Sequence, residues 1–217
     1  MITEYDVDAF ARGEICRVGG YSLTQRALEF CAFAPGARLA DIGCGKGATV
    51  RYLRAAGFDA YGLDCSASAI EQAGPHCQIG GAHLLPYAAD SMDGLFYECS
   101  LSQMEEPFQV LREGWRVLRS GGKLIISDIY ARNEEFQTGG HILNRSQWLL
   151  LCDKTNYSRL LFEDRSEDLK ALNAQLLWKY GCGIPEEVYG CCDAIDLKAA
   201  RCGYFLMIAR VSSKEPQ

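Results

Sequence analysis

The sequence predicts a doubly wound α/β fold, with a mostly parallel sheet and helices on both of its faces. Short apolar strands alternate with amphipathic helices along most of the chain, a pattern typical of parallel sheets with right-handed crossovers. The 217 residues are 48% hydrophobic and 23% charged, which is ordinary globular composition and enough chain to bury a core. We therefore expect a single domain over residues 1–217.

The first half of the chain divides at its glycine and proline residues. Ser22 is a suitable N-cap for a helix, Pro35-Gly36 ends that helix, and Gly74-Pro75 ends a later one. The expected helices are 22–33, 48–56 and 66–73, and the expected strands are 38–42, 59–63 and 77–80.

The second half is less regular after residue 130. KLIISDIY at 123–130 is the strongest strand pattern, and the amphipathic stretch before it closes at Ser120-Gly121-Gly122. The expected helices are 108–118, 145–153 and 169–180, and the expected strands are 94–98, 123–130, 157–164 and 204–211.

The overall charge favours a small-molecule ligand. The net charge is −6 and no Lys/Arg block interrupts it, so a nucleic-acid face is not indicated. The N-terminal MITEYDVDAF lacks the pattern of a signal peptide, and the apolar runs are far shorter than the roughly 20 residues of a membrane helix. We expect a cytoplasmic protein without a membrane segment, either a monomer or a homodimer.

The most informative segment is LADIGCGKG at residues 39–47. A strand, a glycine turn and a helix form the crevice of nucleotide-binding sheets, and glycines let the backbone approach a ligand closely. The carboxylate of Asp41 can hold a cationic amine. Asp64, at the end of the next strand, can accept both hydroxyls of a ribose. A purely structural turn, and a dinucleotide site, are the competing interpretations, but Asp41 would repel a pyrophosphate.

DIGCGKG followed by GLD resembles the class I methyltransferases that use S-adenosylmethionine (SAM), and more narrowly their ubiquinone-biosynthesis-type (type 11) group. LLPYAADSMDGLFYECSLSQMEEP and RVLRSGGKLIISD are similar to further stretches of that family, so the resemblance covers about residues 36–130. It implies a Rossmann-like, seven-stranded sheet and transfer of a methyl group from SAM to a small molecule. Residues 1–35 would then be a helical or lid segment, 36–130 the cofactor-binding core, and 131–217 an acceptor-side insertion with the last strands.

The resemblance also implies roles for particular residues. Residues 41, 43 and 45 would surround the methionine part of SAM and residue 64 its ribose, while residues 65 and 82 would line the adenine. Glu98 falls where relatives use a backbone carbonyl for the methionine amine. Gly81 replaces an acid that receives the adenine amino group in many relatives, and His83 is a candidate substitute. The cofactor-binding candidates are Asp41, Gly43, Cys44, Gly45, Asp64, Cys65, Ala82, His83 and Glu98.

The acceptor pocket is expected at the C-terminal edge of the strands. Methyl transfer from a sulfonium is an in-line displacement that needs alignment more than a fixed set of catalytic residues. His141, which follows Gly139-Gly140, is the candidate for proton transfer; a solvated loop histidine is the alternative. The other candidates for this pocket are Arg17, Tyr21, Ser100, Gln103, Tyr130 and Trp148.

The eleven cysteines do not form a disulfide pattern. Cys182, Cys191, Cys192 and Cys202 gather near the C-terminus, and thiolates bind soft metals and metalloids well. A thiol or arsenite-like acceptor is therefore one alternative function, and a SAM- or metal-binding module without catalysis is another. The spacing does not match a structural zinc site, and buried or loop thiols are the simpler interpretation.

Overall fold

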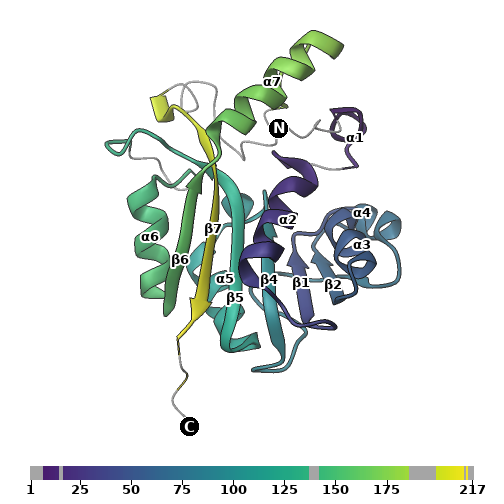
Figure 1. Cartoon of the computed structure of the whole chain (residues 1–217), viewed down its shortest axis with the longest axis vertical. Coiled ribbons are helices and arrows are strands. Elements are labelled where there is room, and N and C mark those ends of the chain that lie inside the picture. The colour runs from purple at the N-terminus through teal and green to yellow at the C-terminus, as the bar shows by residue number, and fades with distance from the viewer. Residues whose placement is uncertain (1–6, 15–16, 137–141, 186–198, 213, 215–217) are drawn as a thin grey trace.

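The computed structural model describes residues 7–14, 17–136, 142–185, 199–212 and 214. A seven-stranded sheet with the order β3-β2-β1-β4-β5-β7-β6 runs through it (Figure 1). β7 pairs antiparallel with β5 and β6, and the remaining pairs are parallel, so the expected mostly parallel, seven-stranded sheet is confirmed. The strands are β1 Arg38–Ile42, β2 Asp59–Asp64, β3 Cys77–Ile79, β4 Met92–Glu98, β5 Leu118–Tyr130, β6 Tyr157–Asp164 and β7 Gly203–Val211.

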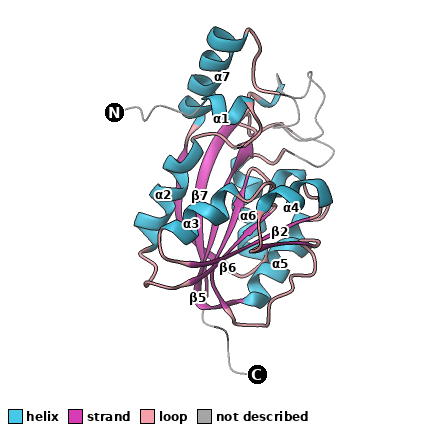
Figure 2. Cartoon of the chain, turned by 90° about the vertical axis from the view of Figure 1, so that its right-hand side faces the viewer, coloured by secondary structure: helices cyan, strands magenta, loops and turns pink. Residues whose placement is uncertain are grey.

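Helices cover both faces of this sheet (Figure 2). α2 and α3 pack into the apolar layer on one face, and α5 and α6 into the layer on the other. The helices are α1 Val7–Ala11, α2 Gly20–Cys31, α3 Ala48–Ala55, α4 Ala67–Ala73, α5 Pro107–Val117, α6 Arg145–Lys154 and α7 Ser166–Tyr180, with a short 3-10 helix η1 at Leu101–Gln103.

The central strands are apolar on both sides, as a covered parallel sheet requires. Phe96 and Ile125 belong to the layer under α2 and α3, whereas their neighbours Tyr97 and Ile126 belong to the layer under α5 and α6. Each of these four side chains is completely buried. Because neighbouring residues of a strand point to opposite faces, continuous apolar runs such as Leu124–Ile126 serve both layers at once.

Some elements differ from the sequence prediction. α1 and η1 were not predicted, because five and three residues are too short to show a helical period. α7 begins at Ser166, three residues before the predicted start, since its polar first turn lacks apolar spacing. β5 begins at Leu118, before the glycine turn that was expected to precede it.

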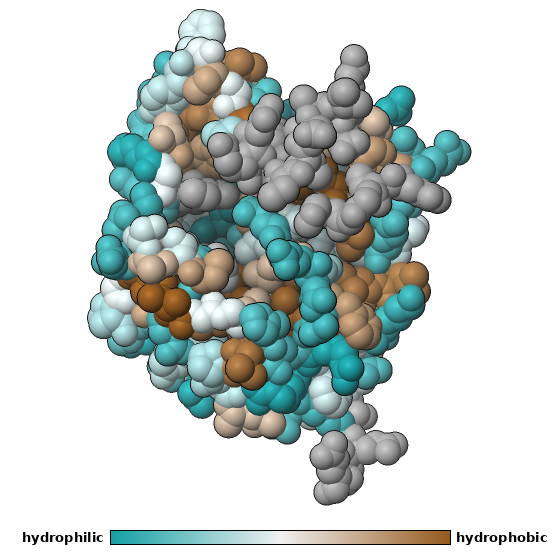
Figure 3. Space-filling view, turned by 180° about the vertical axis from the view of Figure 1, so that it is seen from behind, coloured by the Kyte–Doolittle hydropathy of each residue, from teal (hydrophilic) through white to brown (hydrophobic). Residues whose placement is uncertain are grey.

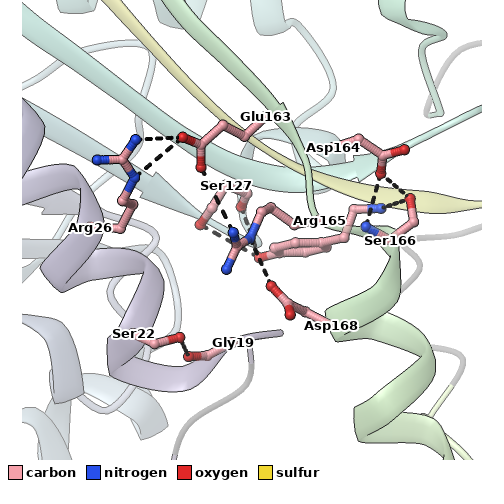
Figure 4. A network of polar contacts seen from close by, with 10 residues as sticks. Gly19, Ser22, Arg26, Ser127, Glu163, Asp164, Arg165, Ser166 and Asp168 are labelled. Carbon is pink, nitrogen blue, oxygen red and sulfur yellow. Dashed lines mark hydrogen bonds and ion pairs between the residues drawn. The ribbon is translucent and has the colours of Figure 1, made fainter. Parts of the chain in front are cut away.

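Ion pairs tie α2 to the far edge of the sheet (Figure 4). Arg26 of α2 donates to Glu163 of β6 at 2.7 Å, and Glu163 lies 3.9 Å from Arg165. Arg165 in turn donates to Asp168 in the first turn of α7 at 2.7 Å. This chain of charges links α2 with β6 and the first turn of α7.

Polar and apolar residues are mixed over the face opposite to that of Figure 1 (Figure 3).

Within the described ranges, we find no helix with the length and apolar character that crossing a membrane requires.

Candidate active site

A cavity of about 690 Å³ opens at the C-terminal ends of β1, β2 and β4. Its walls come from the N-terminal segment, the glycine turn after β1, the end of β2 and the segment that follows β4. This edge of the sheet is where ligands bind in α/β folds of this kind, and the volume is that of an ordinary small-molecule site.

The glycine turn is held against the neighbouring strand. The backbone N–H of Gly43 donates to the carbonyl of Leu63 at 2.7 Å, and its φ of 80° suits glycine far better than other residues. A Cβ at this position would lie 2.5 Å from the Cβ of Ser100. Ser100 also donates its hydroxyl to the carbonyl of Ile42 at 2.8 Å, so the segment after β4 packs directly on the turn.

Asp64 braces the same turn from the end of β2. One carboxylate oxygen accepts the N–H of Gly45 at 2.7 Å, and the other accepts the N–H of Ser66 at 2.8 Å. Each carboxylate oxygen has a further lone pair for a ligand hydroxyl. The side chain therefore orders the turn and still faces the cavity with acceptor capacity.

Asp41 is a buried carboxyl group in which one oxygen lacks a hydrogen-bond partner among the described residues. Its residue is 3% exposed, and its Oδ1 has no hydrogen-bond partner among the described residues. Burial, followed by the nearby charge of Glu98, raises the pKa of Asp41 well above its usual range. A ligand ammonium group reaching the cavity floor would supply both the missing donor and the compensating charge.

Glu98, at the end of β4, is the centre of a buried polar network. It accepts the hydroxyl of Thr24 at 2.7 Å and that of Thr49 at 2.6 Å, and the guanidinium of Arg17 lies 3.1 Å away. The side chains of Arg17 and Glu98 are 6% and 3% exposed. Sequence reasoning pointed to the backbone of Glu98 and missed Thr24 and Thr49, whose contacts join distant parts of the chain.

The structure brings most of the cofactor-binding candidates together. Asp41, Gly43, Cys44, Gly45, Asp64, Cys65, Ala82 and Glu98 all line the cavity, and so do Arg17, Ser100 and Gln103 from the acceptor-side candidates. His83 lies outside this set. It is exposed, and its ring would be 2.5 Å from a Cβ at Gly81, so its imidazole lies against Gly81 outside the lining of the cavity.

Three acceptor-side candidates do not line the cavity. Tyr21 stacks on Tyr52 with ring centroids 4.6 Å apart. Tyr130 packs edge-on against Phe205, and Trp148 is 1% exposed in the same apolar layer. Tyr130 and Trp148 were expected near an acceptor pocket, and the structure places both side chains in the apolar layer under α5 and α6, away from the described cavity.

The cysteine candidates are only partly described. Cys182 is exposed and Cys202 half-buried, and the described residues hold no group of three side chains that could bind a metal ion. His141, Cys191 and Cys192 lie outside the described residues. The thiols that do meet are Cys44 and Cys77, whose hydrogen bond raises the pKa of Cys44 and lowers that of Cys77.

Several cavity residues carried no recognisable signal in the sequence. Phe10 and Ala11 of α1, Met104 after η1, and Pro185 add apolar surface, and Lys46 adds a charge beside the glycine turn. Phe10 and Pro185 stand far from the glycine motif in the sequence, and only the fold brings them to it.

Residues 40–126 match the family model described as a methyltransferase domain. This segment, which holds the glycine turn and both acids, is therefore similar to a methyltransferase domain. Among relatives, the methyltransferase GfsG of Streptomyces halstedii is 34% identical over 125 residues, covering 52% of this chain and 45% of its own length. The alignment thus covers less than half the length of that relative. The similarity therefore concerns only part of the relative.

Solved structures extend this likeness over nearly the whole chain. The cyclase SpnF superposes with a TM-score of 0.68 and 25% identity, covering 88% of this chain and 80% of its own. Phosphoethanolamine N-methyltransferase 2 of Haemonchus contortus, solved with S-adenosylhomocysteine (SAH), superposes with a TM-score of 0.74 over 98% of this chain and 59% of its own. At 16% identity the second likeness concerns the fold alone. Since one of these structures is named a cyclase, the reaction has to be argued from the site.

Proposed function

We propose that this protein binds SAM in the described cavity and transfers its methyl group to a small-molecule acceptor. The observation that carries the proposal is the unpartnered Oδ1 of Asp41, buried on the cavity floor beside the glycine turn. An isolated buried carboxyl is costly unless a cationic donor meets it, and the methionine end of SAM carries such a group.

The remaining cavity residues suit the rest of the cofactor. Asp64 has lone pairs for ribose hydroxyls, and the guanidinium of Arg17 lies at the same cavity with a charge that suits the methionine carboxylate. Cys65 and Ala82 provide surface for the adenine. When bound, SAM supplies a methyl group already activated by its sulfonium, so the protein has to bind, orient and exclude water.

A small acceptor fits the other wall of this cavity. Phe10, Met104 and Pro185 give it an apolar surface, and Gln103 lies beside them. The net charge of −6 disfavours a nucleic-acid substrate. Nothing in the described residues singles out a thiol or metalloid acceptor.

Calorimetric titration tests this proposal, with SAM and SAH as ligands and NADH as the control. We expect micromolar binding of both SAM-type ligands and none of NADH. Release of SAH from SAM in the presence of an acceptor panel then measures turnover. Failure of both ligands to bind would contradict the proposal, and binding of NADH alone would favour a dinucleotide site. Tight SAM binding without SAH formation across the panel would favour a module that does not methylate.

A further inference from the structure

Two carboxyl groups end neighbouring strands at the floor of the cavity. Asp41 lies on β1 and Glu98 on β4, and the strands pair in parallel. Both residues are buried, at 3% and 8% exposure. Two carboxylates held close together in a dry site repel each other, so each needs its own compensation.

Glu98 has its compensation within the protein. The guanidinium of Arg17 lies 3.1 Å from its Oε2, and the hydroxyls of Thr24 and Thr49 donate to its two oxygens. This arrangement satisfies an ionised carboxylate whether or not a ligand is present.

Asp41 has no comparable set of donors among the described residues. Its Oδ1 is without a hydrogen bond. Burial and the charge of Glu98 push its pKa upward, and Arg17 opposes them only in part. Cys77 of β3 and Asp64 of β2 also raise its pKa. The thiol of Cys44 and the phenol of Tyr87 are the other titratable groups that interact with it, and the charge of Asp41 in turn raises the pKa of both. A proton is the simplest way to stabilise such a group in the absence of a ligand.

We propose that Asp41 is protonated in the empty protein and releases its proton when the ammonium group of the cofactor enters the cavity. The O–H bond of the carboxyl breaks, the proton passes to the solvent, and the carboxylate accepts a hydrogen bond from the ammonium group. This inference rests on the proposed function, and it adds that cofactor binding is coupled to the release of one proton.

The coupling gives cofactor affinity a defined pH dependence. Below the pKa of Asp41 in the empty protein, each binding event has to expel a proton, so affinity falls about tenfold for each pH unit of acidification. Above that pKa the affinity becomes constant, until the α-amino group of the ligand itself loses its proton.

The direct test is calorimetric titration of the full chain with SAH at pH 6.5, in phosphate, PIPES and imidazole buffers. The buffers differ in ionisation enthalpy, so the slope of the observed binding enthalpy against that quantity gives the number of protons released. We expect a positive slope of at most one proton per SAH, which grows as the pH is lowered. A slope of zero with SAH still bound would overturn this inference and leave the proposed function intact. If SAH does not bind, the proposed function fails and this inference fails with it.

Two controls locate the proton. The first is 5′-methylthioadenosine, which carries the adenosine and sulfur of SAH without the ammonium and carboxylate, and which should bind with a slope near zero. The second is a pair of variants. Asp41→Asn should bind SAH more weakly, with no proton release and no pH dependence between pH 5.5 and 7.5. Asp64→Asn should also bind more weakly, yet keep the proton release of the wild type.

The possible results distinguish Asp41 from other groups as the source of the proton. Proton release that persists in Asp41→Asn, or that appears equally with 5′-methylthioadenosine, would assign the proton to another group and overturn the inference. If Asp41→Asn does not fold, as judged by circular dichroism, the wild-type slope and the methylthioadenosine control still decide the matter.

Discussion

At the residue scale, Asp64 has a structural role, and we propose a binding role for it as well. Its carboxylate accepts the N–H groups of Gly45 and Ser66, and we assign its remaining lone pairs to a ribose. Asp64→Ala should weaken SAH binding by on the order of 1–3 kcal/mol, because ligand hydrogen bonds are lost and the Gly45 N–H loses its acceptor. The matched control is Asp59→Ala at the opposite end of β2, a half-buried acid with long ion pairs, which should leave binding unchanged in calorimetry. Equal losses in both variants would contradict the assignment.

Gly43 is required by its backbone and by its surroundings. Its φ is 80°, and an added Cβ would meet Ser100 at 2.5 Å. Gly43→Ala should destabilise the protein by about 2–5 kcal/mol, from left-handed strain together with overpacking. Gly36 has a similar φ of 72° with nothing within 4 Å of an added Cβ, so Gly36→Ala should cost only about 1–2 kcal/mol. Urea unfolding of the two variants measures the difference, and identical losses would show that the Ser100 contact is unimportant.

The glycine turn and both acids could be placed from sequence because each follows directly from a strand end. Tyr130 could not, since its position at the end of a strand leaves open which face its side chain takes, and a one-residue shift reverses the answer. Trp148 carried a usable signal: Cys152 is four residues later and buried with it. That spacing marks the inner face of a helix.

At the element scale, a buried ion pair joins the N-terminal segment to β4. Arg17→Met would leave Glu98 buried without its cation, which should cost about 3–5 kcal/mol of unfolding free energy. Adding Glu98→Gln removes the unpaired charge, and its amide oxygen still accepts from one of the two hydroxyls of Thr24 and Thr49 while its NH2 group donates to the other. The double variant should therefore be more stable than Arg17→Met alone in urea unfolding. A double variant that is less stable would refute this account of the pair.

Asp128 of β5 holds η1, the short helix whose Gln103 faces the cavity. It accepts the N–H and hydroxyl of Ser102 at 2.9 and 2.7 Å, and burial raises its pKa from 3.8 to about 6. The folded protein therefore holds the proton of Asp128 more tightly than the unfolded chain does. The stabilisation of the folded protein by this proton is complete below the pKa of the unfolded state, and it is lost as the pH rises through about 6.

The matching experiment compares wild type with Asp128→Asn. Their difference in unfolding free energy should change by on the order of 3 kcal/mol between about pH 4 and pH 7, with the wild type losing ground as the pH rises. Chemical denaturation at several pH values measures it. A difference that is flat with pH, or that has the opposite sign, would show that Asp128 does not titrate in this way.

Element positions were predictable where breakers and apolar periods coincide. β1 and β6 have the predicted bounds, and α5 begins one residue early because Pro107 suits the first turn of a helix. α1 could not be predicted from the sequence, because the burial of its side chains depends on contacts with α7, which is distant in the sequence. Local patterns therefore specify the core elements, while the short N-terminal helix depends on tertiary packing.

At the scale of the whole molecule, the cavity is assembled from segments that local sequence cannot connect. The strand order β3-β2-β1-β4-β5-β7-β6 brings the ends of β1, β2 and β4 together, and the seven-strand count came from family resemblance rather than from the residues. The N-terminal segment then closes the cavity from above the sheet edge, with Phe10 and Arg17 in its wall. We propose that this assembly lets one cavity hold both a cofactor and an acceptor.

The most direct test of the central claim is a crystal structure of this protein with SAH. We predict electron density for SAH in the cavity at the ends of β1, β2 and β4, with its ammonium group hydrogen-bonded to Oδ1 of Asp41 and its ribose hydroxyls to Asp64. SAH bound elsewhere, or bound in this cavity with neither carboxylate in contact, would contradict the account.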